Sequence, residues 1–359
     1  MPYCTECGTE LGEGAKFCPS CGTRIGQQVE DRERIVRVQR RPIGTLAVLL
    51  IVLVFSAAVI VALASLPIRT LDYTRRHTVP YVWTGVDTLN LVLSADVAGV
   101  DVSFERRTLM GDRLAVSIDV TATTRVGVFG APDFLNLISQ TAIDSNVQTV
   151  TSEIEIVEPG WPPYFLTNVT CLIRIDPSLN TTLNIRTATG GIVVHTQAGV
   201  ALNSLSLEAT TGGIEINLAK DVVVSGDISL SATTGGIQFS WDNVFATKDV
   251  LVDLTTTTGG VDVDIKQDER LSGNITLKAE ATTGGVNFAI DIQGDIGAKI
   301  DSLVTTGDID IRRQAGFSLV YSYADRAGLL SDNHPARNSF NVDLRTTTGG
   351  IDIDARYTP

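Results

Sequence analysis

The chain has few of the residues on which enzymes depend. Its 359 residues include three histidines, His77, His195 and His334, which lie far apart, and no GxSxG, HExxH or GxxxxGK[ST] motif. Because His195 follows the apolar run Ile192–Val194, we expect it on the surface at a strand end. No pair of carboxylates stands out as a candidate for glycoside hydrolysis. We therefore expect a protein that is not an enzyme.

Aromatic and basic residues are also few. Aromatic residues make up 6% of the chain, and its many Thr, Gly, Val and Ile residues point to β structure. The formal net charge is −13, of which residues 1–42 carry +1 and the remainder −14. An acidic remainder repels phosphate groups, so we expect no nucleic-acid partner. Cations, basic surfaces and simple solubility remain compatible with this charge.

One long stretch, Ile43–Leu66, contains no charged side chain. A helix rises about 1.5 Å per residue, so roughly 20 apolar residues cross a hydrocarbon core of ~30 Å. The sequence therefore predicts one transmembrane helix over residues 43–66, with Pro42 before it and Pro67 after it. Two alternatives remain: a buried core helix, and a cleaved signal peptide ending near Ala62–Ala64.

Arginines are unequally distributed around this stretch. Six precede it (Arg24, Arg32, Arg34, Arg37, Arg40 and Arg41), and three follow it within a similar distance (Arg69, Arg75 and Arg76). The positive-inside rule then predicts a single-pass protein of the cell membrane, with its N-terminus cytoplasmic and its C-terminal domain extracellular. Residues 25–42 form a polar basic linker, whose arginines either contact anionic membrane lipid or only set the topology.

Four of the five cysteines form two CxxC pairs near the start of the chain. They are Cys4, Cys7, Cys18 and Cys21, with ten residues between the pairs and a glycine after each pair. Two such pairs place four thiolates at the corners of a tetrahedron, the arrangement of closed structural Zn²⁺ sites. The alternative, two disulfides, is disfavoured in a reducing cytoplasm. Cys171 stands alone, and we expect it to be buried, with an intermolecular disulfide as the alternative.

Residues Tyr3–Arg24 resemble the short zinc-ribbon module at the N-termini of many prokaryotic membrane proteins. Both cysteine pairs match, although Thr5 and Glu6 stand where such modules often have Pro-Asn. The resemblance implies a structural zinc in a domain over residues 1–24 and binding of a protein partner. Because all four positions are cysteine, no coordination position is open for catalysis.

The remainder contains a repeat built on Thr-Gly-Gly. The threonines of its copies are Thr189, Thr211, Thr234, Thr258, Thr283, Thr306 and Thr348, and Asp308 replaces the second glycine of the sixth copy. The first glycine recurs after 22, 23, 24, 25, 23 and 42 residues. Alternating apolar and polar residues precede and follow the glycines, which predicts a strand, a corner and a second strand in each repeat.

Two architectures fit this pattern: an antiparallel meander of tight hairpins, and a right-handed parallel β-solenoid. We favour the solenoid, because stacking its seven coils would align the seven threonines in one ladder at the corner. We assign residues 67–180 to a β-rich N-terminal cap with the first coils, and residues 181–359 to the repeat solenoid. The 42-residue gap indicates an inserted loop over residues 312–339, either a side cap or a binding feature.

Stacking would also align acidic side chains on one outer face. Asp262, Asp310 and Asp352 would share a column near Glu215, and Asp264 and Asp354 would share the next. Such columns either hold Ca²⁺ or form a solvated acidic surface. The second interpretation is favoured because Gln238, Asn287 and Arg312 interrupt the columns and the calcium-binding nonapeptide repeat is absent.

The repeats, over about Asn184–Tyr357, resemble the adhesin-like β-repeat family of bacteria and archaea, in which Thr/Ser-x-Gly units form a β-helical scaffold, often beside a membrane anchor. The resemblance implies a membrane-anchored, non-enzymatic envelope protein that binds an envelope or extracellular partner through its repeats. The alternative is a transmembrane signalling or scaffold protein, whose cytoplasmic zinc ribbon recruits a weakly held partner.

Overall fold

The computed structural model describes residues 3–24, 45–64, 69–80, 87–109, 112–126, 138–145, 149–156 and 165–359. The chain forms two compact units, Met1–Ala62 and Leu63–Pro359. The predicted linker 25–42 lies outside the described residues. The same is true of residues 43–44 and 65–66, at the ends of the predicted transmembrane helix.

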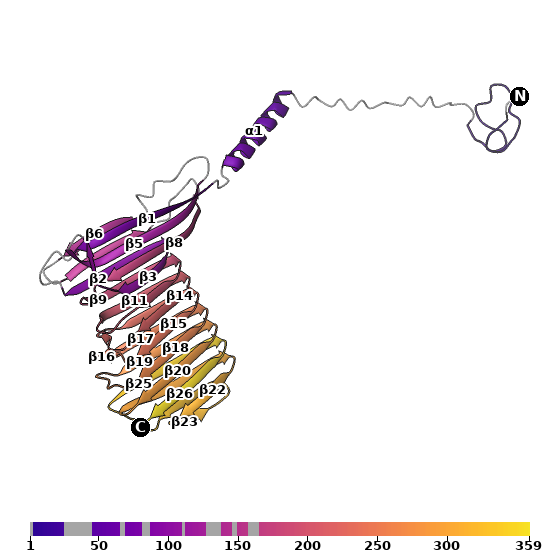
Figure 1. Cartoon of the computed structure of the whole chain (residues 1–359). Coiled ribbons are helices and arrows are strands. Elements are labelled where there is room, and N and C mark those ends of the chain that lie inside the picture. Colours follow the sequence, from indigo (N-terminus) through magenta and orange to yellow (C-terminus); the bar gives the residue numbers. More distant parts are fainter. Residues whose placement is uncertain are drawn as a thin grey trace. The chain divides into compact units, whose positions relative to one another are not determined.

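One helix, α1 (Thr45–Ala64), falls inside the predicted span 43–66 (Figure 1). Its first turn has no acidic residue and its last turn no basic residue. Among the described residues, no helix meets the combined length and hydropathy requirement for crossing a membrane. The transmembrane helix therefore remains a prediction of the sequence.

The second unit consists of two long β-sheets that pack face to face around one core (Figure 1). The first sheet contains β1 (Arg69–Pro80), β3 (Gly99–Phe104), β4 (Arg107–Leu109), β5 (Asp112–Val126), β8 (Phe165–Ile175), β10 (Ile192–His195), β12 (Ile214–Leu218), β15 (Ile237–Asp242), β18 (Val261–Gln267), β20 (Val286–Gln293), β22 (Ile309–Ala315) and β26 (Ile351–Thr358). The second contains β2 (Thr88–Val97), β6 (Ile138–Ser145), β7 (Thr149–Ile156), β9 (Asn180–Thr189), β11 (Ala201–Thr211), β13 (Val223–Val224), β14 (Ile228–Thr234), β16 (Phe245–Ala246), β17 (Val250–Thr258), β19 (Ile275–Thr283), β21 (Ile296–Thr306), β23 (Phe317–Ser322), β24 (Arg326–Ser331) and β25 (Asn338–Thr348).

Each repeat is one coil of a parallel solenoid, with one strand in each sheet. Within each sheet, the strands of neighbouring repeats pair in parallel, which confirms the solenoid and excludes the meander. The predicted threonine ladder is present, because Thr211 pairs with Thr189 and Thr234, and Thr258 with Thr234 and Thr283. The right hand of the coiling remains a prediction.

The first glycine of each corner is required for two reasons. Gly235, for example, has φ 145°, a conformation that residues with a side chain rarely adopt. A Cβ on Gly235 would lie 2.1 Å from the carbonyl oxygen of Gly212 in the preceding coil. The Gly-Gly corner therefore allows both the sharp turn and the close stacking of one coil on the next.

Alternate residues of the strands fill the space between the two sheets. In β18, for instance, Val261, Val263 and Ile265 are buried while Asp262 and Asp264 are exposed. The largest buried side chain, Trp241, packs edge-on against Phe340 and donates a 2.8 Å hydrogen bond from Nε1 to the buried Gln267. Strict alternation thus produces one continuous apolar core with polar outer faces.

The order of the coils at the C-terminal end differs from the order of the sequence. Thr348 pairs with both Thr283 and Thr306, so the coil β25/β26 lies between β19/β20 and β21/β22. The last repeat of the chain is therefore inserted between the two repeats that precede it in the sequence. The hairpin β23–β24 explains the difference: β24 pairs antiparallel with the outer edge of β21, which leaves only the inner edge of β21 free for the last repeat.

The opposite end of the unit shows the same kind of rearrangement. The coil β2/β3 lies between β7/β8 and β9/β10, although β7 and β8 follow β2 and β3 in the chain. Antiparallel strands again cover the outside, with β5 against β8 and β6 against β7. Antiparallel strands thus flank both sheets at this end, but only the second sheet at the C-terminal end, where β22 is the edge strand of the first sheet. Such flanking strands limit edge-to-edge association.

The predicted inserted loop 312–339 is corrected by the structure. Residue 312 already belongs to β22, residue 339 to β25, and the hairpin of β23 and β24 lies between them. The 42-residue gap in the repeat therefore marks an end cap made of strands.

Candidate metal centre and binding surfaces

The two cysteine pairs of the head, residues 3–24, form two loops with the same local structure. In the first, the Cys4 N–H donates to the Thr9 carbonyl at 2.8 Å and the Gly8 N–H to the Cys4 carbonyl at 2.8 Å. In the second, the corresponding bonds from the N–H groups of Cys18 and Gly22 measure 2.7 and 2.9 Å. Gly8 and Gly22 have φ values of 76° and 73°, which explains the glycine after each CxxC.

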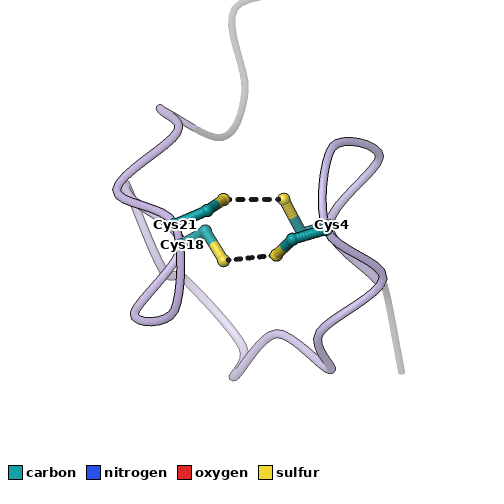
Figure 2. Close-up of side chains that lie close together, drawn as sticks. Cys4, Cys18 and Cys21 are labelled. Atoms are coloured by element: carbon teal, nitrogen blue, oxygen red, sulfur yellow. Dashed lines mark hydrogen bonds between the residues drawn. The ribbon is translucent and has the colours of Figure 1, made fainter.

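The four sulfur atoms of the predicted site face one another across these loops (Figure 2). The Sγ atoms of Cys4 and Cys21 are 3.6 Å apart, those of Cys7 and Cys18 are 3.5 Å apart, and all four lie within 4.8 Å of one another. A tetrahedron with Zn–S bonds of about 2.3 Å has edges of about 3.8 Å. All four cysteines are free thiols, so this donor set fits Zn²⁺ and not two disulfides.

Two threonines that the sequence analysis did not single out support the ligands. The Thr9 hydroxyl lies 3.2 Å from the Cys7 sulfur, and the Thr23 hydroxyl 3.3 Å from that of Cys21. Hydrogen bonding with the side chain and backbone of Thr9 lowers the pKa of Cys7, and hydrogen bonding with those of Thr23 lowers the pKa of Cys21 to about 6. Thiolates are the metal-binding form, so both threonines favour the ligand state. The recurrence of Cys-Gly-Thr in both pairs is the signal that would have identified them.

The head has almost no apolar core of its own. Its only buried cluster, among the described residues, consists of Cys4, Leu11 and Cys18. Its two aromatic residues are exposed instead: Tyr3 by 62% and Phe17 by 56%, with the guanidinium of Arg24 lying 5.7 Å from the Phe17 ring centroid. The metal must therefore supply most of the stability of this fold.

The acidic columns form in the solenoid as predicted, and basic side chains neutralise one end of them. Asp352 pairs in register with both Asn287 and Asp310, and Asp354 lies in the neighbouring column. Arg312 forms a 2.6 Å ion pair with Asp352 and lies 3.8 Å from Asp310, while Arg313 lies 3.6 Å from Asp354. Across the described residues, the only His, Cys, Asp and Glu cluster with metal-binding spacing is the set of four cysteines. Asp262, Asp264 and Asp310 in these columns are exposed to solvent on the outer face of the first sheet.

The remaining candidates do not converge on one site. His195 is exposed at the end of β10, as predicted, while His77 lies in β1 and His334 in the segment between β24 and β25. Cys171 is fully buried in β8, and burial raises the pKa of its thiol to about 12. It is thus an apolar core residue, and its burial argues against an intermolecular disulfide.

Aromatic side chains gather on the hairpin β23–β24. The Tyr321 hydroxyl donates a 2.7 Å hydrogen bond to Asp301, and burial together with this bond raises the pKa of Tyr321 to about 12. Tyr323 is 65% exposed, stacks on Tyr321 with ring centroids 6.2 Å apart, and lies 5.9 Å from the guanidinium carbon of Arg326. This cap therefore presents an exposed aromatic and cationic group to solvent.

Comparison with known proteins confirms the zinc-ribbon prediction for the head. Residues 3–25 match the zinc-ribbon domain family. Among curated proteins, none matches the chain.

Three solved structures resemble a larger part of the chain. A candidate cell adhesion protein from Clostridium sporogenes has 13% identity and a TM-score of 0.38, with 80% of this chain and 100% of that chain covered. A candidate adhesin from Bacteroides fragilis has 10% identity and a TM-score of 0.34, and the match covers 79% of this chain and 97% of that chain. A candidate adhesin from Parabacteroides merdae has 8% identity and a TM-score of 0.26, and the match covers 79% of this chain and 95% of that chain. TM-scores this low do not establish a common fold.

Proposed function

We propose that this protein is a single-pass, membrane-anchored, non-enzymatic protein of the cell envelope, whose solenoid binds a surface or matrix component. The observation that carries the proposal is the build of the solenoid. Its strands bury one row of side chains in a continuous core and expose the other row as a regular polar surface, as in β14 and β18. A scaffold of this kind presents many polar groups in fixed register over a large area, which suits adhesion.

The proposed anchor and orientation come from the sequence. The uncharged stretch 43–66 supplies the membrane span, and the excess of arginines before it places the head in the cytoplasm. The arginines of residues 25–42 would then lie beside the lipid headgroups. A reducing cytoplasm also suits a site of four free thiols.

Topology is tested by adding protease to intact cells that carry the full chain. We expect the solenoid to be degraded and the head to be protected, as detected with antibodies to each part. Protection of the solenoid, or loss of the head from intact cells, would refute the proposed orientation.

Adhesion is tested by comparing cells that carry the full chain with cells that carry a shortened protein. The shortened protein lacks residues 68–359 and retains the head and the predicted membrane span. We expect the deletion to reduce binding of the cells to host or matrix surfaces. Equal binding by both kinds of cell would refute the proposal.

A second candidate function, recruitment of a cytoplasmic partner, is favoured by the exposed aromatic residues of the head. Tyr3 and Phe17 lie on the surface of a folded unit for which a pure adhesin has no evident need. The surface that a head of this size can bury against a partner is much less than the ~800 Å² per partner of a standard interface. The partner would therefore be held weakly. Deleting residues 1–24 alone distinguishes the two functions. If the protein is an adhesin, cells carrying the deletion should still adhere; if it recruits a cytoplasmic partner, the deletion should abolish its function.

A further inference from the structure

The solenoid contains a cavity where the chain enters three neighbouring strands. Its volume is about 640 Å³, within the range of small-ligand sites. Its walls come from the segment before β19, the turn before β21 and the segment before β25. Because β25 lies between β19 and β21, the rearranged order of the coils places the segment before β25 directly between the other two.

Hydrogen bonds from two asparagines fix the walls of this cavity. The Asn333 amide donates at 2.9 Å to the carbonyls of both Gly294 and Ile296, which ties the segment before β25 to the turn before β21. The Asn338 amide donates to the carbonyl of Leu271, which ties the same segment to the one before β19. The cavity is therefore formed before any ligand arrives, and this lowers the entropic cost of binding.

The lining combines an apolar part with two cationic side chains. Leu271 and Ile296 are almost fully buried in the wall, with 4% and 2% exposure, and Ser272, Asn333 and Asn338 add polar side chains. Arg270 and Arg337 contribute guanidinium groups. Asp295 is the only acidic lining residue, so the cavity is positive although the chain as a whole carries −13.

Unlike Arg312 and Arg345, these two arginines are not held in close ion pairs with carboxylates of the described residues. Arg312 and Arg345 are held by carboxylates at 2.6 and 2.8 Å. Arg270 has only Asp295 at 3.8 Å, with both side chains more than 85% exposed, a contact worth little in water. Arg337 forms no ion pair with any residue that the structure describes. Both guanidinium groups are thus free to bind an incoming anion.

We propose that this cavity binds an acidic saccharide. A carboxylate or sulfate of the sugar is held by the guanidinium groups of Arg270 and Arg337, and its hydroxyl groups face the polar side chains of Ser272, Asn333 and Asn338. Guanidinium groups bind planar carboxylates and sulfates through paired, charge-assisted hydrogen bonds. The proposal rests on the adhesive function proposed above and assigns it a site and a ligand class.

The test measures saccharide binding by the full-length protein in detergent, using titration calorimetry. The acidic probes are a hyaluronan hexasaccharide, which carries carboxylates, and a chondroitin sulfate hexasaccharide, which carries carboxylates and sulfates. Chitohexaose is the neutral probe and inorganic sulfate the free anion. We expect at least one acidic saccharide to bind at least tenfold more tightly than chitohexaose and sulfate, and to weaken as salt is added.

The double variant Arg270→Gln/Arg337→Gln is expected to weaken that binding at least tenfold while its thermal unfolding curve stays unchanged. The control variant Arg186→Gln/Arg313→Gln removes two positive charges outside the cavity and should bind like the unaltered protein. The proposal is overturned if neither acidic saccharide binds, if chitohexaose or sulfate binds equally well, or if both double variants weaken binding equally.

Cell adhesion distinguishes this proposal from the function on which it rests. If Arg270→Gln/Arg337→Gln abolishes saccharide binding but cells lacking residues 68–359 still adhere normally, the site stands and the adhesive function fails. If the deletion abolishes adhesion but the double variant binds saccharide normally, the adhesive function stands and the site fails.

Discussion

The head and the solenoid solve the problem of stability in opposite ways. The head buries only Cys4, Leu11 and Cys18, and its four sulfurs face one another as a metal site. The solenoid buries one continuous apolar core between two sheets, and no coil stands alone. A short segment is thus ordered by one strong centre, whereas a repeated segment is ordered by many weak contacts between neighbours. Four predictions test this contrast.

Removal of zinc should have the largest effect, and only on the head. Structural zinc sites supply on the order of 10 kcal/mol or more to such small domains, so a chelator should unfold residues 3–24 completely. Acid should act in the same direction, because protonation of the thiolates, including Cys21 with its pKa near 6, displaces the metal as the pH falls. Nuclear magnetic resonance should show the loss of structure in the head, and the melting curve of the solenoid should stay unchanged.

Cysteine variants provide the control for zinc. Cys18→Ser should abolish stoichiometric zinc, whereas Cys171→Ala, far from the head in the sequence and buried in the solenoid, should retain one equivalent. A chelated head that stays folded would show that its small core is sufficient.

The order of the C-terminal coils should be visible by cross-linking. Thr283 and Thr348 are directly paired, at the strand spacing of about 4.8 Å, so Thr283→Cys/Thr348→Cys should form a disulfide in high yield. Thr283→Cys/Thr306→Cys is the control, because these positions are two strands apart, about 9.6 Å, and should not cross-link. The reverse result would mean that the coils stack in the order of the sequence.

A corner glycine should be far more sensitive than a glycine in an open turn. Gly235→Ala should destabilise the solenoid by about 3 kcal/mol or more, because it combines a positive φ with a clash against Gly212. Gly199→Ala has φ 83° but no atom within 4 Å of the added Cβ, so about 1 kcal/mol is expected. Denaturant unfolding measures both, and equal losses would remove coil stacking as the cause.

The smallest effect concerns the buried carboxylate of Asp119 in β5. Burial raises the pKa of this group, but hydrogen bonds and charge from Arg76 and Arg174, at 2.5 and 2.7 Å, outweigh burial and hold the pKa below its ordinary value. A lowered pKa means that the stabilisation is present above the ordinary pKa of about 4 and is lost as the pH falls through the lowered value.

Asp119→Asn should therefore cost about 2 kcal/mol at neutral pH and less in acid. The exposed pair of Asp343 with Arg345, at 2.8 Å, is the control, and Asp343→Asn should cost less than about 1 kcal/mol. If Asp119→Asn and Asp343→Asn lower the melting temperature equally at neutral pH, the burial of Asp119 does not increase its contribution to stability.

Much of the fold could be predicted because its signals are local. Two CxxC pairs, each followed by glycine, determined the zinc ligands, because thiolate geometry leaves few alternatives for four cysteines at that spacing. The period of the Thr-Gly-Gly repeat and the alternation around it determined the parallel coils, the threonine ladder and the buried face of each strand. The supporting roles of Thr9 and Thr23 depend on hydrogen bonds across a turn, and the sequence hinted at them only through their recurrence.

The order of the coils was decided by the tertiary structure alone. The alternation recurs in every repeat, and the Thr-Gly-Gly corner recurs in all but the sixth, where Asp308 replaces the second glycine. The repeat period alone therefore does not rank the neighbours of a coil. The hairpin β23–β24 determines the order, because β24 pairs with one edge of β21. The last repeat, which begins with β25, therefore pairs with the other edge of β21. As a result, the segments carrying Arg270 and Arg337, 67 positions apart in the sequence, line one cavity. Local patterns specified what each coil is, and the blocked edge specified where the last coil lies.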